Sequence, residues 1–110
     1  MEALLYLKKA EPIKSITVSY LKLVGSYIVP PQSVEIWGGA EQGQMKLLGK
    51  VNPEQPTQID AGLVLPVEVK TDGKPIRFIK VIMTPVTKLP SWHPGKGEKG
   101  WAFIDEILLN

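Results

Sequence analysis

The chain predicts an all-β fold: an antiparallel β-sandwich of the jelly-roll kind, with little or no helix. Val and Ile, which favour strands, contribute ten residues each. Ten glycines and ten prolines fall mostly between the apolar runs, where turns would separate one strand from the next. No segment carries an apolar stripe at the 3.6-residue period of a capped helix. Together these observations favour two packed sheets of short strands.

The first two candidate strands occupy residues 3–8 and 14–23. In the second, Ile16, Val18 and Tyr20 alternate with smaller polar residues. Alternation at a period of two is typical of a strand with one face buried and the other exposed.

A stiff break at Pro30 and Pro31 precedes the next strands, because consecutive prolines fix φ and donate no hydrogen bond. Residues 33–37 and 45–51 form the third and fourth candidates. Residues 52–56 form a loop.

Residues 61–70 form a strand that contains Pro66, which places it at a sheet edge or a bulge. The sequence over 71–74 contains Asp-Gly and predicts a hairpin turn. Residues 76–84 are almost entirely apolar and predict a central strand covered on both faces. Residues 101–109 form the last strand.

Size and composition predict a single domain over residues 1–110, with 44% apolar and 22% charged residues. The 13 basic residues include only one arginine, Arg77, and they are scattered along the chain, so we expect no nucleic-acid partner. The absence of cysteine excludes disulfides and thiolate metal sites. No apolar run is long enough to cross a bilayer, so membrane insertion is not expected, and no signal peptide is visible.

The most informative segment is the loop over residues 85–100. It places Trp92 beside the only histidine, His93, and follows them with mobile charges. An aromatic ring, an imidazole and charged side chains at the edge of a rigid strand are typical of a recognition surface. The ligand-binding residues that we predict from this loop are Trp92, His93, Lys96, Glu98 and Lys99.

The other tryptophans are assigned by their position in the predicted strands. Trp37 is in phase with Glu35 and opposite in phase to Ile36, so it is a second candidate for stacking against a ligand. The alternative for Trp37 and Trp92 is packing beneath a loop. Trp101 leads into an apolar strand and is predicted to lie in the core.

Catalysis is not expected. His93 has no second histidine or cysteine to join it, and no nucleophile-elbow motif supports a serine triad. The segment Gly95 to Gly100 has the spacing G-x-G-x-x-G, but it leads into a strand rather than a helix, so the glycines are better explained by a tight loop.

Adjacent carboxylates on the last strand, Asp105 and Glu106, would point to opposite faces and cannot form a facing acid–base pair. Asp105 could tie down a neighbouring loop. Glu106 could lend an oxygen to a hard cation such as Ca²⁺, which takes six to eight oxygen ligands.

Two motifs resemble a known family. The run from Pro90 to Gly95, with the closing Trp101 to Ile107, resembles the end of factor 5/8 type C (discoidin-like) domains, above all those at the C-termini of Bacteroidetes chitobiases and β-N-acetylhexosaminidases. The passage from Tyr27 to Gly39 is similar to a Pro-then-strand segment of the same domains. The two motifs cover about a third of the chain.

The resemblance implies a galactose-binding-like jelly roll that binds carbohydrate, such as a glycan or a chitin-type oligosaccharide, through loops at one end. It further implies a C-terminal module attached to the catalytic domain of a glycoside hydrolase, in an extracellular, periplasmic or cell-surface protein. Many relatives hold a structural Ca²⁺, to which the glutamate corresponding to Glu106 contributes. The alternative is a structural or protein-interaction domain that buttresses its neighbour and binds no sugar.

Overall fold

The computed structural model describes residues 2–59 and 62–110, and this part of the chain folds into seven strands and two short 3₁₀ turns. The strands are β1 Glu2–Pro12, β2 Ser15–Lys22, β3 Ser33–Gly39, β4 Lys46–Val51, β5 Leu63–Lys70, β6 Pro75–Thr84 and β7 Ile104–Leu109. The 3₁₀ turns are η1 Val24–Ser26 and η2 Gln42–Gln44.

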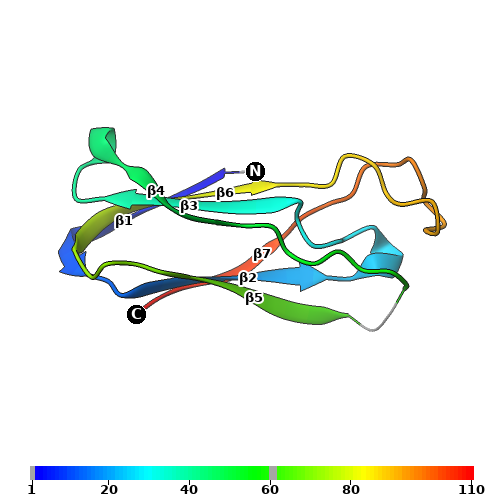
Figure 1. Cartoon of the computed structure of the whole chain (residues 1–110), viewed down its shortest axis with the longest axis horizontal. Coiled ribbons are helices and arrows are strands. Elements are labelled where there is room, and N and C mark those ends of the chain that lie inside the picture. Colours follow the sequence, from blue (N-terminus) through cyan, green and yellow to red (C-terminus); the bar gives the residue numbers. More distant parts are fainter. Residues whose placement is uncertain (1, 60–61) are drawn as a thin grey trace.

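Two antiparallel sheets face each other (Figure 1). The four-stranded sheet has the order β1-β6-β3-β4, and the three-stranded sheet has the order β5-β2-β7. Among the described strands, only β3 and β4 are consecutive in sequence and paired in one sheet, while every other connection crosses to the opposite sheet. The predicted antiparallel β-sandwich is confirmed.

The core lies between the sheets, where the alternating apolar residues of the strands meet. Its fully buried members include Ile16 and Val18 from β2, Ile36 from β3, and Ile79 and Val81 from β6, each with 0% of its surface exposed. Pro66 lies on β5, which is an edge strand as predicted, so its missing N–H does not interrupt a central ladder.

Three local predictions are corrected. The segment 71–74 is not a hairpin turn, because β5 and β6 belong to different sheets. β6 is central but not covered on both faces: Phe78, Lys80 and Ile82 point outward and are partly exposed. β1 continues to Pro12, past a bulge between Tyr6 and Glu11.

Trp101 does not lie in the core. It is 53% exposed, whereas the next residue, Ala102, is only 7% exposed. The last strand begins at Ile104, and Trp101 forms an isolated parallel bridge with Ile28. Because neighbouring residues of extended chain alternate in direction, the inward position taken by Ala102 turns the indole outward.

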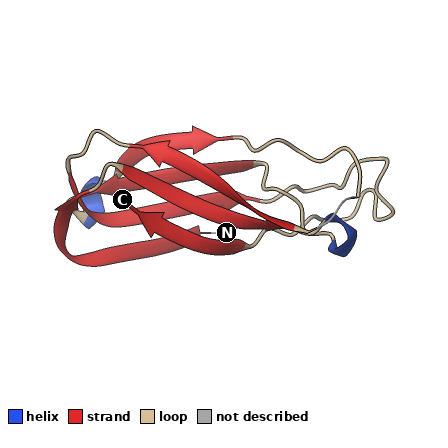
Figure 2. Ribbon diagram, turned by 90° about the horizontal axis from the view of Figure 1, so that it is seen from below, coloured by secondary structure: helices blue, strands red, loops and turns tan. Residues whose placement is uncertain are grey.

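One face and one end of the molecule matter for function. The outer face of the four-stranded sheet carries the side chains that alternate away from the core: Leu4, Tyr6, Glu35, Trp37, Leu47, Lys50, Phe78, Lys80 and Ile82. The longest connections gather at one end of the 47 × 24 × 20 Å molecule (Figure 2). Within the described ranges, no helix has the length and apolar character needed to cross a membrane.

Candidate functional site

The loop over residues 85–100, here called the end loop, is held in shape by its own backbone. The amide of Leu89 donates to the carbonyl of Glu98 at 2.8 Å, and the amide of Gly97 donates back to the carbonyl of Leu89 at 3.2 Å. The amide of Gly100 donates to the carbonyl of Val86 at 3.0 Å and closes the base of the loop. These bonds satisfy polar groups that a loose loop would leave to water.

His93 is buried beneath the end loop, with only 2% of its surface exposed. The amide of Gly95 donates to its Nδ1 at 2.8 Å, and its Nε2 lies 2.7 Å from the carbonyl of Val24. Because Nδ1 accepts, the hydrogen of the neutral ring sits on Nε2 and is donated to Val24. Both ring nitrogens of His93 are therefore used inside the fold, and the side chain is buried.

The aromatic neighbour of His93 is Tyr27, whose ring stands edge-on at 5.2 Å between centroids. Tyr27 adopts a left-handed backbone conformation, with φ of 66°, at the end of η1. A bulky residue there is unusual and needs support from its surroundings. The support comes from His93 and from a small apolar cluster of Val24, Val29 and Leu89 against which Tyr27 packs.

Trp92 stands at the surface of the end loop, 38% exposed, with its ring tilted on that of His93 at 5.7 Å between centroids. Lys96, Glu98 and Lys99 are exposed on the same loop. The Nζ of Lys99 lies 5.0 Å from the ring centroid of Trp101, within cation–π range. The end loop thus presents an anchored aromatic ring and three charged side chains.

Trp37 lies elsewhere, on the outer face of the four-stranded sheet. Its Nε1 donates to Oε1 of Glu35 at 3.0 Å, and the Nζ of Lys80 lies 5.4 Å from its ring centroid. The predicted binding residues are therefore divided between two places, the end loop and the sheet face.

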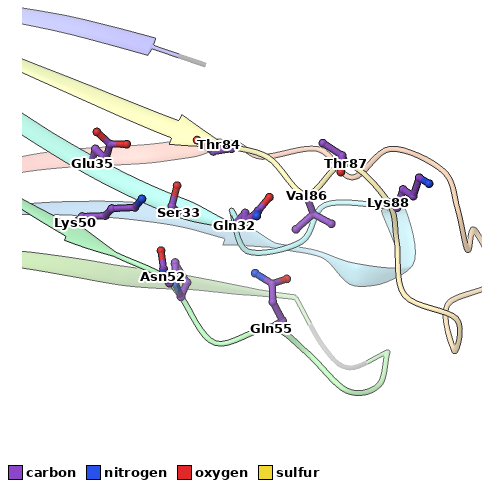
Figure 3. A pocket seen from close by; sticks show the side chains of 11 residues that line it. Gln32, Ser33, Glu35, Lys50, Asn52, Gln55, Thr84, Val86, Thr87 and Lys88 are labelled. Carbon is purple, nitrogen blue, oxygen red and sulfur yellow. The ribbon is translucent and has the colours of Figure 1, made fainter.

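A hollow on the outer face of the four-stranded sheet, here called the sheet groove, was not predicted from the sequence. It has a volume of about 770 Å³ and opens where the outer face of the four-stranded sheet meets the connections that follow β4 and β6 (Figure 3). Its lining residues are Gln32, Ser33, Glu35, Lys50, Asn52, Pro53, Gln55, Thr84, Val86, Thr87 and Lys88.

Most residues that line the sheet groove are polar or charged, and the exceptions are Pro53 and Val86. Ser33 faces Thr84 across the β3–β6 ladder, and Glu35 faces Lys50 across the β3–β4 ladder. The side-chain amide of Gln55 donates to the carbonyls of Pro30 and Pro31 at 3.0 and 3.1 Å, which holds the connection after β4 in place. Hydroxyls, amides, a carboxylate and ammonium groups together can hydrogen-bond a ligand that carries many hydroxyls.

Glu106, for which the resemblance implies a role in binding Ca²⁺, belongs to β7. It lies opposite Ser19 on the outer face of the three-stranded sheet. A register shift leaves Asp105 outside the pairing, so both carboxylates are exposed instead of pointing to opposite faces. Within the described part of the chain, no three His, Cys, Asp or Glu side chains come together.

Comparison with models of known protein families finds no match, and comparison with curated proteins finds none either.

Proposed function

We propose that this domain is a non-catalytic carbohydrate-binding module of the discoidin-like, galactose-binding-like type. In this proposal it is attached to a glycoside hydrolase resembling a chitobiase or hexosaminidase in an exported protein. The observation that carries it is the sheet groove, an open hollow of about 770 Å³ lined by hydroxyl, amide and charged side chains. The resemblance of the Trp92 and Trp101 motifs to discoidin-like domains supports the same ligand class.

The expected affinity is low. A few hydrogen bonds, each contributing about 1 kcal/mol net, give a binding free energy of several kcal/mol. That corresponds to dissociation constants around millimolar. Weak modules of this kind act by holding an attached enzyme near a polymer, where many contacts add up.

The test is an NMR titration of the domain with N-acetylglucosamine, galactose and chitin oligosaccharides. Gln32, Asn52 and Gln55 carry the side-chain amides of the groove, and we expect their NH₂ signals to shift in a saturable way. Asn52→Ala should weaken binding about threefold to tenfold, the loss of one hydrogen bond. Thr17→Ala, on the outer face of the other sheet, is the matched control and should leave binding unchanged. Saturable shifts confined to Trp92 and its neighbours would move the site to the end loop.

A second candidate function is a protein-interaction or buttressing domain that binds no sugar. It is favoured by the apolar side chains exposed on the outer face of the four-stranded sheet: Tyr6 is 73% exposed, Leu4 47% and Leu47 46%. Flat titrations with every sugar up to tens of millimolar would select this function over the first.

A further inference from the structure

The sheet groove and Trp37 lie on one continuous face. Side chains two residues apart on a strand point the same way and are separated by roughly 7 Å. Along β3, Ser33 and Glu35 line the groove, and Trp37 is the next outward residue. The ladder places Thr84 beside Ser33 and Lys80 beside Trp37. Trp37 therefore lies on the same sheet face as the groove, directly beyond the lining residue Glu35.

Glu35 joins the groove to the aromatic ring. It lines the groove, and its Oε1 accepts the hydrogen bond from Nε1 of Trp37 at 3.0 Å. A hydrogen bond to a charged acceptor is stronger than a neutral one and fixes the direction of the indole. The ring is thereby held on the sheet instead of turning freely.

The aromatic part of the face continues beyond Trp37. Phe78 lies two residues before Lys80 in β6 and is the next outward residue in the direction away from the groove. Its ring centroid lies 6.5 Å from that of Tyr6. From Thr84 to Phe78 the strand advances six residues, or about 20 Å. A polar half and an aromatic half therefore lie in line along the strands.

A sugar has both polar and apolar groups, which match the polar groove and the aromatic side chains of this sheet face. Its hydroxyls hydrogen-bond at the rim, while the C–H groups on its faces are apolar and pack against flat aromatic rings. A single sugar at the Ser33 end of the groove lies four residues, or roughly 14 Å, along β3 from Trp37 and cannot contact the indole at the same time. A chain of sugars can do both at once.

We infer that the outer face of the four-stranded sheet binds an extended stretch of a linear polysaccharide. One part of the chain hydrogen-bonds in the sheet groove, and a following sugar packs on Trp37. Lys80 has a flexible stem that lets its ammonium group move off the indole and meet sugar hydroxyls. Glu35 acts as a positioning residue for Trp37. The inference rests on the proposed function and adds that the preferred ligand is the interior of a chain, not a single terminal sugar.

The experiment begins with a panel of soluble polysaccharides and chitin oligosaccharides, with binding followed by affinity electrophoresis and calorimetry. For the glycan that binds, the monosaccharide is compared with its trimer and hexamer. We expect affinity to rise about tenfold or more with chain length. Trp37→Ala should remove this gain, so that the hexamer binds the variant no more tightly than the monosaccharide does.

Glu35 is tested by paired substitutions. Glu35→Ala should lower hexamer affinity and move the indole N–H signal of Trp37. Glu35→Gln keeps an oxygen acceptor for Trp37 and should restore both. Thermal denaturation of each variant shows that the fold is intact, and Trp92→Ala serves as the matched tryptophan control that retains the chain-length gain.

The outcomes separate the two proposals. If no glycan of the panel binds, the proposed function itself fails. If a glycan binds with equal affinity as monomer and hexamer, or if Trp92→Ala and not Trp37→Ala removes the gain, the function stands and the sheet-face inference is overturned.

Discussion

At the scale of single residues, His93 shows how a side chain with functional chemistry can serve the fold alone. Its ring bonds to Val24 in η1, which lies 69 residues away in the sequence, and to Gly95 in the end loop, which lies two residues away. The bonds require a neutral ring with one donor and one acceptor nitrogen. The loop that carries Trp92 is thus anchored from within.

Removal of this imidazole should destabilise the domain. His93→Ala leaves the amide of Gly95 without its partner, and it removes one of the two hydrogen bonds to the carbonyl of Val24, which still accepts from the amide of Tyr27. Together with the lost packing of the buried ring, this should cost about 2–4 kcal/mol in the free energy of unfolding. Urea denaturation should show the loss. His93→Gln retains one donor and one acceptor and should lose less. Equal stability of His93→Ala and the parent domain would contradict this role.

Gly95 is predicted to tolerate no side chain. A Cβ atom there would lie 2.5 Å from the ring carbon Cζ of Tyr27. Because that ring is packed on His93, Gly95→Ala should cost about 1–3 kcal/mol in the free energy of unfolding. At Gly43 a Cβ would meet nothing within 4 Å, so Gly43→Ala is the control and should change the melting temperature little. A wild-type melting temperature for Gly95→Ala would show that the ring moves freely.

At this scale the sequence predicted the exposed residues of the end loop but not the direction of every side chain. It located Trp92 and its exposed charged neighbours, because turn residues and charges lie at loop surfaces. It assigned His93 to a ligand and Trp101 to the core, since a residue type does not reveal which way a side chain turns. Ala102 decides the direction of Trp101, and the partner of His93 lies far away at Val24.

At the scale of secondary-structure elements, β6 is a central strand, which pairs with β1 on one side and with β3 on the other. Its two faces differ: Ile79 is 0% exposed, whereas Ile82 points outward and is partly exposed. Ile79→Ala should lower the free energy of unfolding by about 2–5 kcal/mol, since it leaves a cavity in the core. Ile82→Ala should cost clearly less, and comparable losses in urea denaturation would argue against the assigned faces.

The connection between β5 and β6 contains Asp72, whose side chain accepts a local hydrogen bond. The amide of Lys74 donates to its Oδ1 at 3.0 Å, and this bond lowers the pKa of the carboxyl, with a smaller contribution from the charges of Lys74 and Lys46. A carboxyl whose pKa is lowered by folding stabilises the protein above its ordinary pKa, and the effect disappears as the pH falls through the lowered value.

Asp72→Asn keeps an oxygen acceptor and removes the charge. At neutral pH and low salt, the variant should have a slightly lower urea midpoint than the parent domain. The difference should close as the pH falls through the lowered pKa of the parent carboxyl, where that group becomes protonated. The effect is small because the side chain is exposed and screened by salt. A difference that widens in acid would contradict the sign.

Strand positions were predictable from the sequence, and strand partners were not. The alternation of Ile16, Val18 and Tyr20 marked β2 to within a residue or two, since a half-buried strand imposes a period of two. The Asp-Gly turn at 71–74 predicted a hairpin because local chemistry fixes how sharply a chain turns but not which sheet it enters next. The pairing of β6 with β1 and β3 depends on the whole fold.

At the scale of the whole molecule, strand pairing is dominated by distant segments. In the described chain, β1 pairs with β6, and β2 pairs with both β5 and β7. Long loops must close before such contacts form, so we expect refolding on the millisecond-to-second scale that is typical of β-sandwiches. Stopped-flow tryptophan fluorescence after dilution from urea measures this. Complete refolding within microseconds would show that distant pairing does not limit the rate.

The sheet groove is also a property of the whole molecule. Its lining comes from residues 32–35, 50–55 and 84–88, which the two sheet ladders bring together. Each segment alone looks like an ordinary polar strand end or loop. The only local signal was the outward phase shared by Glu35 and Trp37, which identified Trp37 as a candidate without revealing the hollow beside it.

The last residue of the chain is fastened at the end of the sandwich away from the end loop. The carbonyl of Asn110 accepts the amides of Lys14 at 2.6 Å and Ser15 at 3.1 Å, in the turn between β1 and β2 (Figure 1). A biotin or affinity tag added after Asn110 would therefore anchor the domain to a sensor surface by this turn. The sheet groove, which opens beside the connections that follow β4 and β6, would then face the flowing solution, where long glycans in free diffusion could reach it without steric interference from the support.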